Sequence, residues 1–79
     1  MDAKVLDEIH RFTAAVDHAD LYTYLDIDPD VDRPAILHAL QVRRSWAQGQ
    51  QANPKFRTEA LWVIKNIALM TTALTTEAA

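Results

Sequence analysis

Four aspartates fall within the seven-residue stretch DIDPDVD, residues 26–32, and this stretch is the part of the sequence that most resembles a metal site. A calcium-binding EF-hand loop also begins with alternating oxygen ligands, but it needs glycine at its sixth position and a bidentate glutamate at its twelfth. Counted from the first aspartate, these positions hold Val31 and Leu37. Asp28, which precedes a proline, is typical of a turn, and Asp32 is typical of a helix N-cap. We therefore predict that the aspartates mark turns and helix starts, and that no metal binds.

The other side chains that could support catalysis are isolated. His10, His18 and His38 do not have the spacing of the paired histidines in a zinc-binding helix. Ser45 follows two arginines and lacks the glycine elbow of a serine nucleophile. The chain has no cysteine, and its single glycine excludes a glycine-rich phosphate loop. The sequence thus predicts a protein that is not an enzyme and uses no cofactor.

Composition is typical of a small, folded helical domain. The chain has 79 residues, of which 49% are hydrophobic and 24% are charged. Little glycine together with abundant Ala, Leu and Ile favours helices, and a chain of this length forms one domain. No apolar run approaches the ~20 residues that span a bilayer, and the N-terminus lacks the pattern of a signal peptide. We expect an all-α, cytoplasmic protein without a membrane segment.

Charge is distributed unevenly along the chain. The net charge is −3, but residues 1–32 hold nine acidic residues against two bases, whereas residues 33–65 hold six bases against Glu59. One interpretation is that the two parts neutralise each other within the fold or between copies. The other is that the basic part faces an acidic partner. The negative net charge argues against nucleic acid as that partner.

Two helices are predicted in the first third of the chain. In residues 3–17 the apolar residues recur with helical spacing and form one narrow stripe, which suits packing against a single neighbouring helix. The stripe consists of Val5, Ile9, Phe12 and Val16. A short helix is expected in DLYTYLDI, residues 20–27, where Asp20 is placed to cap the first turn.

A longer helix is predicted in DRPAILHALQVRRSWAQ, residues 32–48, with Asp32 at the N-cap and Pro34 in the first turn. Its apolar face is formed by Ile36, Ala39, Leu40 and Ala47. Arg43 falls within this face, and we expect its aliphatic stem to cover apolar surface while the guanidinium reaches solvent or a carboxylate. Gly49 is expected to mark the end of the helix.

The last predicted helix starts after QQAN, with Asn53 as its cap and Pro54 at its first position, and continues through PKFRTEALWVIKNIALMTTAL. Its main stripe consists of Phe56, Ala60, Val63, Ile67, Met70 and Leu74. Trp62 and Leu69 lie one heptad apart on nearly the opposite side. A helix that is apolar on two sides is central in its fold or offers one side to a partner. Residues 3–17 are the expected cover for one of these sides.

A series of motifs in residues 20–74 carries a family resemblance. The stretch DLYTYLDIDPDVDRPAILHALQVRR begins with an acidic residue and an aromatic, continues as a YxxL short helix and a proline turn, and leads into a helix with an acidic cap. The matching residues are Asp20, Tyr22, Leu25, Ile27, Pro29, Ile36 and Ala39. After the next loop, an NP pair and a phenylalanine are matched by Asn53, Pro54 and Phe56. In this order the motifs resemble those of a J-domain, the helical module of DnaJ-type co-chaperones.

The resemblance implies a J-domain-like bundle of three main helices plus one short helix, with residues 3–17 as an extra N-terminal helix. J-domains stimulate the ATPase of heat-shock chaperones through a His-Pro-Asp tripeptide, but residues 48–50 at the matching place read Gln-Gly-Gln. We therefore expect no such stimulation. Arg43 and Arg44 keep the basic character of the partner-facing helix, which implies a binding surface that serves a different partner.

The main hypothesis is a non-catalytic protein-interaction or assembly module. Residues 1–74 would form the domain, and residues 75–79 a tail or the start of a linker within a larger protein. Because tryptophan and arginine are over-represented among the residues that dominate interface energy, they supply most of the candidates. The candidate protein-binding residues are Arg43, Arg44, Trp46, Trp62 and Leu69. The plainer interpretation places the tryptophans in or beside the core and the arginines in solvent.

Two alternatives remain open at this point. The first is a homodimer whose acidic and basic parts pair across a twofold axis. The second is a DNA-binding helix-turn-helix, which the arginines favour and the net charge opposes. For the main hypothesis the expected partner is another protein with an acidic surface.

Overall fold

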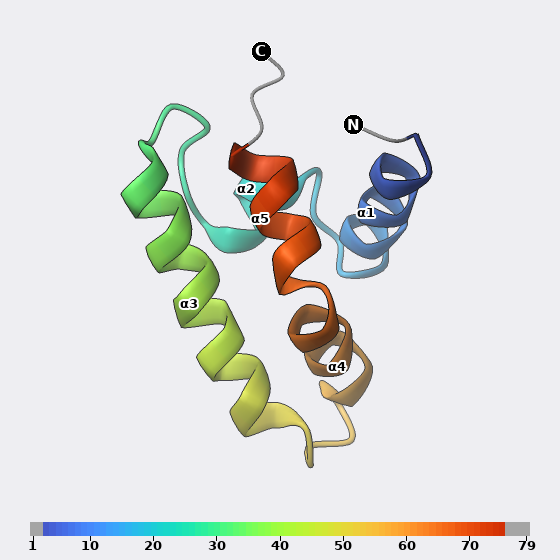
Figure 1. Cartoon of the computed structure of the whole chain (residues 1–79). Helices are drawn as coiled ribbons and strands as arrows, with labels where there is room; N and C mark the ends of the chain where they lie inside the picture. The colour runs from blue at the N-terminus through green and yellow to red at the C-terminus, as the bar shows by residue number, and fades with distance from the viewer. Residues whose placement is uncertain (1–2, 76–79) are drawn as a thin grey trace.

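Residues 3–75 are described by the computed structural model, and they form five helices and no strand (Figure 1). The helices are α1 (Ala3–Ala15), α2 (Leu21–Leu25), α3 (Arg33–Gln50), α4 (Arg57–Lys65) and α5 (Ile67–Thr75). The prediction of a small all-α bundle is therefore confirmed. The outermost parts of the predicted domain and tail, residues 1–2 and 76–79, lie outside the described residues.

The end of α1 is set by Asp17, whose backbone lies in the left-handed region with φ 62°. The N–H of His18 donates to the carbonyl of Thr13 at 2.9 Å, and the N–H of Asp17 donates to the carbonyl of Ala14 at 3.2 Å. This pair of hydrogen bonds closes many helices and satisfies carbonyls that have no partner further along the helix. As a result α1 stops slightly before the end predicted for it.

Aspartate side chains cap α2 and α3, as the sequence predicted. Asp20 Oδ1 accepts the backbone N–H of Thr23 at 2.9 Å, and Asp32 Oδ1 accepts that of Ala35 at 3.2 Å. Each bond satisfies one of the N–H groups that a first helical turn leaves unpaired. Asp28 accepts the N–H two residues further on at 3.0 Å and so holds the connecting turn. The backbone N–H bond from Thr23 is also the main reason why the pKa of Asp20 lies below its usual value.

The connection between α3 and α4 differs from the prediction. α3 passes through Gly49, which does not adopt a left-handed conformation, and ends at Gln50. Asn53 Oδ1 accepts the N–H of Lys55 at 3.0 Å, and the carbonyl of Asn53 accepts the N–H of Phe56 at 3.1 Å. Because of these bonds, the segment that was predicted to start the last helix forms a turn instead. α4 consequently begins after Phe56 rather than at the proline.

The last predicted helix is divided into α4 and α5 at Asn66. The backbone N–H of Asn66 donates to the carbonyls of Trp62 and Val63 at 3.0 and 3.2 Å, and its side-chain Nδ2 donates to Trp62 at 2.9 Å. An asparagine whose side chain bonds the preceding turn competes with the regular helix ladder. The prediction of a single continuous helix is therefore wrong at this residue.

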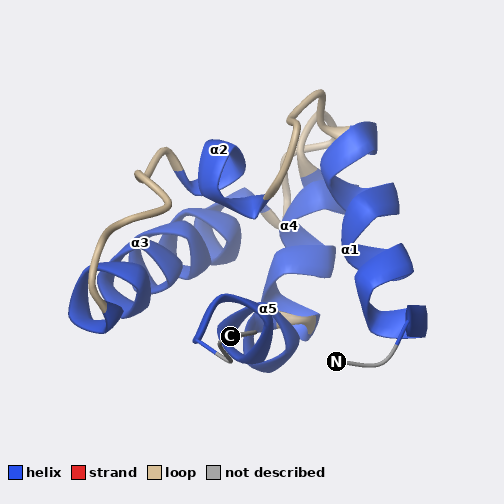
Figure 2. Ribbon diagram, turned by 90° about the horizontal axis from the view of Figure 1, so that it is seen from above, coloured by secondary structure: helices blue, strands red, loops and turns tan. Residues whose placement is uncertain are grey.

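The helices pack as a layered bundle in which α4 and α5 lie between α3 and α1 (Figures 1 and 2). α3 runs antiparallel to α4 and α5 and packs along both of them (Figure 1). α1 packs against α5, and α2 contacts both α1 and α3. The expectation that residues 3–17 cover one side of the last helical segment is thus confirmed.

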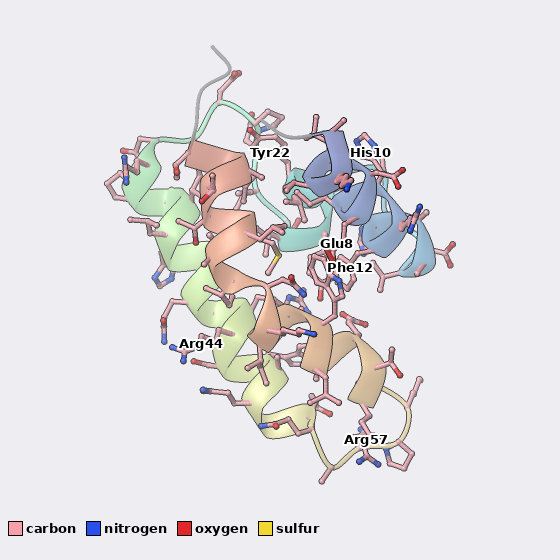
Figure 3. The ribbon with its side chains drawn as sticks, turned by 45° about the vertical axis from the view of Figure 1, so that its right-hand side comes forward. Glu8, His10, Phe12, Tyr22, Arg44 and Arg57 are labelled. Carbon is pink, nitrogen blue, oxygen red and sulfur yellow. The ribbon has the colours of Figure 1, made fainter. Side chains whose placement is uncertain are left out.

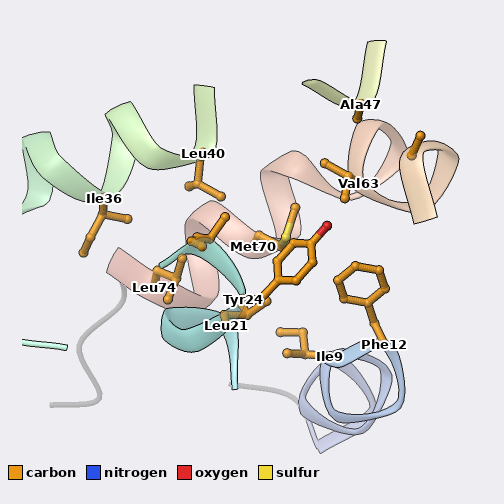
Figure 4. Close-up of a cluster of buried hydrophobic side chains, with 12 residues drawn as sticks. Ile9, Phe12, Leu21, Tyr24, Ile36, Leu40, Ala47, Val63, Met70 and Leu74 are labelled. Carbon is orange, nitrogen blue, oxygen red and sulfur yellow. The ribbon is translucent and has the colours of Figure 1, made fainter. Parts of the chain in front are cut away.

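The core draws on every helix (Figure 4). Its buried apolar residues are Ile9, Phe12, Leu21, Tyr24, Leu25, Ile36, Leu40, Ala47, Ala60, Val63, Met70 and Leu74. Burying such side chains is the main favourable contribution to the folding of a small domain. Tyr24 has its ring edge-on to Phe12 with 5.0 Å between centroids, and it also takes part in the polar contacts described next.

Candidate functional site

Arg43 is fixed between two aromatic rings. Its guanidinium carbon lies 4.6 Å from the ring centroid of Tyr24 and 4.7 Å from that of Trp46. Nη2 also donates a hydrogen bond of 3.3 Å to the backbone carbonyl of Tyr24, which lies in the last turn of α2, where carbonyls lack helical partners. Arg43 is half-buried and lines an open groove, and within residues 3–75 its guanidinium contacts these rings and the carbonyl rather than a carboxylate. These contacts explain why an arginine occupies the apolar face of α3.

Trp46 and Arg43 line a groove between α2 and α3. The groove has a volume of about 370 Å³, and its lining is mostly apolar. Its residues are Leu25, Ile27, His38, Ala39, Val42, Arg43 and Trp46, and this set is called the α2–α3 groove below. Val42 leaves 55% of its surface exposed here, which is the largest exposed fraction among the exposed large apolar residues.

Tyr24 connects this groove with α4 through its hydroxyl group. The Tyr24 O–H donates to Glu59 Oε2 at 2.5 Å. Burial of the phenol, together with this hydrogen bond, raises the pKa of Tyr24 far above its usual value. The phenol therefore stays protonated and serves as a hydrogen-bond donor inside the bundle.

Trp62 lies on another side of the bundle, where it packs on α1. Its ring stacks on that of Phe12 with 3.8 Å between centroids and 6° between planes. The two rings form part of a second groove, about 480 Å³ in volume, between α1 and α4. Its lining consists of Glu8, Arg11, Phe12, Ala15, Val16, Lys55, Thr58, Glu59 and Trp62, and this set is called the α1–α4 groove below.

The structure brings together only some of the candidate residues. Arg43 and Trp46 are in contact, and both line the α2–α3 groove. Arg44 is exposed on the outer surface of α3 and lines neither groove (Figure 3). Trp62 lines the α1–α4 groove, and Leu69 is half-buried against the core. The candidates therefore belong to separate surfaces and do not form one patch.

Sequence reasoning overlooked several residues of the α2–α3 groove. Val42 could have been found, because Ala39, Val42, Arg43 and Trp46 have the spacing of one helical face. Leu25 and Ile27 reach the groove from α2 and the segment after it. Their position depends on how α2 docks on α3, and no local pattern in the sequence reports that.

The basic residues of α3, the connecting turn and α4 are not neutralised by ion pairs. The ion pair given by the structure joins Arg11 Nη2 and Asp7 Oδ2 at 2.7 Å, and both residues belong to α1. Within residues 3–75, none of the six bases between positions 33 and 65 has an ion-pair partner. Arg57 marks the end of the molecule that carries the α3–α4 turn (Figure 3). Five of the six bases are exposed, and Arg43 is half-buried.

Residues 3–75 contain neither a cluster of metal-ligating side chains nor a helix that could span a membrane. No group of three or more His, Asp or Glu side chains in residues 3–75 is arranged to hold a metal ion. His18 packs edge-on to the ring of Tyr24 at 5.4 Å instead. Over the same part of the chain, no helix has both the length and the apolar character needed to cross a membrane.

Comparison with known proteins finds no family model, curated protein or solved structure that matches the chain.

Proposed function

We propose that the protein is a non-catalytic protein-interaction module whose α2–α3 groove binds an amphipathic helix bearing acidic residues. One observation carries this proposal: an open, mostly apolar groove has a guanidinium held in place at its edge between Tyr24 and Trp46. Apolar anchors of the partner would fill the groove. A carboxylate of the partner would pair with Arg43.

The geometry of the groove favours a helical partner. Ala39, Val42, Arg43 and Trp46 repeat along α3 with helical spacing, and a helix laid beside them presents anchors at matching intervals. Because Arg43 is already held by two rings and a carbonyl, its side chain loses little further freedom on binding. Tryptophan and arginine are also the residue types that most often dominate binding energy.

Charge supports an acidic partner. None of the six bases between positions 33 and 65 forms an ion pair within residues 3–75, and Arg33, Arg43 and Arg44 belong to α3, which forms one wall of the α2–α3 groove. Positive charge beside a binding groove favours the encounter with a negatively charged surface. The partner proposed here is therefore another protein and not a nucleic acid, whose binding the overall charge of −3 opposes.

The J-like motifs fit the same proposal. The segments that carry them form a short helix, a long acid-capped helix and the helices after the turn, which are α2, α3 and α4–α5. Residues 48–50, which replace the His-Pro-Asp tripeptide, lie in the last turn of α3. We infer that the protein is a degenerate J-like domain that binds a partner without stimulating a chaperone ATPase.

Two exposed apolar residues of α3 provide a matched test. Val42 lines the α2–α3 groove, whereas Leu37 is also exposed, at 42%, but does not. Val42→Glu and Leu37→Glu should each change the free energy of unfolding by no more than about 0.5 kcal/mol, since both positions are on the surface. Binding should differ between them, because only Val42→Glu places a carboxylate inside the groove that receives an acidic helix.

The measurement is quantitative affinity capture with wild-type, Val42→Glu and Leu37→Glu chains as bait, followed by titration of the captured protein. We expect Val42→Glu to weaken the complex by at least about tenfold and Leu37→Glu to leave it unchanged. Equal binding by the two variants would refute the assignment of the groove. Light scattering at several concentrations completes the test. A wild-type dimer that Val42→Glu dissociates would assign the groove to self-association.

A further inference from the structure

The α1–α4 groove has a different charge balance from the α2–α3 groove. Two bases also line it, and neither of them forms an ion pair with its carboxylates. Arg11 pairs with Asp7 at 2.7 Å, and the Lys55 ammonium lies 5.3 Å from the ring centroid of Phe56. These contacts leave the carboxylates of the groove without a cationic partner from its own lining.

The two carboxylates belong to Glu8 on α1 and Glu59 on α4. Neither forms an ion pair with a base in residues 3–75. Glu59 accepts the Tyr24 hydroxyl through Oε2, and none of the described residues donates to its Oε1. Because Glu59 is half-buried, this charge is screened by water less than that of an exposed carboxylate.

Aromatic surface forms the wall beside these carboxylates. Trp62 remains partly exposed where it lines the groove, and Phe12 supports it from the other side of the stack. Figure 3 shows Glu8 and Phe12 close together on α1. A cation near an aromatic ring is attracted by the negative ring face, and most strongly by that of tryptophan. Ala15 and Val16 add apolar surface.

From this combination we propose that the α1–α4 groove binds an arginine side chain of a partner peptide. The planar guanidinium stacks on Trp62 and donates hydrogen bonds to Glu8 and Glu59, which are the contacts that guanidinium makes better than ammonium. The aliphatic part of the arginine, with an apolar neighbour in the peptide, covers Ala15 and Val16. A volume of about 480 Å³ lies in the range of sites that enclose a small ligand.

This site is independent of the function proposed for the α2–α3 groove. That groove presents Arg43 to an acidic helix, whereas the α1–α4 groove presents to a basic side chain two carboxylates that neither Arg11 nor Lys55 pairs with. The two sites would therefore select opposite charges on opposite sides of Tyr24. Loss of one type of binding would leave the other in place.

The test uses two short peptides that differ only at the central side chain. One is the acetylated and amidated peptide Ala-Leu-Arg-Leu-Ala, and the other carries citrulline, a neutral analogue of arginine, at the central position. Binding is followed by NMR through the indole N–H signals of the two tryptophans, which a Trp46→Phe variant assigns. We expect the arginine peptide to shift the Trp62 signal and the citrulline peptide to bind at least about tenfold more weakly.

Variants that remove one charge locate the site. Glu8→Gln should weaken binding of the arginine peptide about two- to fivefold, since Glu8 is exposed, and Glu59→Gln about tenfold. Glutamine at position 59 can still accept the Tyr24 hydroxyl, so the fold is retained, and a thermal melt checks this. Asp30→Asn makes the same change in net charge at an exposed position outside the groove and should have no effect.

The possible outcomes separate clearly. Weaker binding in both glutamate variants, with Asp30→Asn unchanged, supports the proposal. The proposal is overturned if the citrulline peptide binds as tightly as the arginine peptide, or if the glutamate variants bind the arginine peptide as tightly as the wild type does. It is also overturned if only the Trp46 signal shifts, or if the arginine peptide does not bind at millimolar concentration. None of these results bears on Val42→Glu, so failure here leaves the proposed function to its own test.

Discussion

The stack between Phe12 and Trp62 joins α1 to α4 and makes a quantitative prediction. The rings are nearly parallel with 3.8 Å between centroids, Phe12 is 7% exposed and Trp62 is half-buried. Replacing either with leucine keeps an apolar side chain but removes the ring contact. We expect each single substitution to lower the free energy of unfolding by about 1–2 kcal/mol. The double variant should lose less than the sum, because the contact can be lost only once.

The expected coupling energy is about 1 kcal/mol, since aromatic pairs contribute roughly 0.5–1.5 kcal/mol beyond their buried area. In a domain of this size, 1 kcal/mol corresponds to a change in Tm of about 4–8 °C. Urea unfolding of the wild type, Phe12→Leu, Trp62→Leu and the double variant, followed by far-UV circular dichroism, measures all four corners of the cycle. Full reversibility of each transition is required for the energies to be compared.

A second cycle provides the control. Leu37 is exposed on α3, so Phe12→Leu and Leu37→Ala should be additive within about 0.5 kcal/mol. If the Phe12 and Trp62 substitutions are equally additive, the ring stack does not stabilise the packing of α1 on α4 and the prediction is wrong. If Trp62→Leu costs no stability at all, Trp62 is a surface residue rather than part of the packing between α1 and α4.

Two further predictions concern polar groups. Tyr24→Phe removes the hydrogen bond to Glu59 and should lower the unfolding free energy by about 1–2 kcal/mol at neutral pH. The pKa of Tyr24 is raised in the folded state, so the phenol ionises first in the unfolded chain. The contribution of Tyr24 to the unfolding free energy is therefore complete below pH ~10 and declines above it. In urea melts above this pH, the unfolding free energy should fall more steeply for the wild type than for Tyr24→Phe, and equal slopes would contradict the prediction. Asp32→Ala removes the α3 cap and should lower the unfolding free energy by about 1 kcal/mol. Asp30→Ala is the control and should change it by no more than about 0.5 kcal/mol. Equal Tm values for the two variants would contradict the role of Asp32 as a cap.

Local signals in the sequence predicted much of the fold. The caps at Asp20 and Asp32 act within three residues of themselves, so the chain nearby contains all the information needed to place them. The division at Asn66 is a different case. Apolar residues continue with helical spacing across it, and that spacing carries no sign of the bond between the Asn66 side chain and the Trp62 carbonyl. Periodicity alone therefore predicted one helix where the structure has two.

The candidate site was predicted less completely, because its grooves depend on contacts between distant segments. Arg43 was recognised as unusual, but its partner Tyr24 lies 19 positions earlier, and only the docking of α2 on α3 brings the two together. Trp62 was recognised as lying on a second apolar side. Its stacking on Phe12 requires α1 to fold back across the bundle. Residue type indicated which side chains matter, whereas tertiary packing decided which of them share a surface.

Tyr24 contacts lining residues of both grooves, so a substitution at Tyr24 itself cannot test either of them separately. Its ring contacts both Phe12 and the Arg43 guanidinium, and its hydroxyl donates to Glu59. Arg43 lines the α2–α3 groove and Glu59 lines the α1–α4 groove, so a change at Tyr24 alters both linings at once. A loss of binding in Tyr24→Phe would therefore assign neither site. Val42 lines only the α2–α3 groove, and a substitution there separates its contribution from the stability of the shared core.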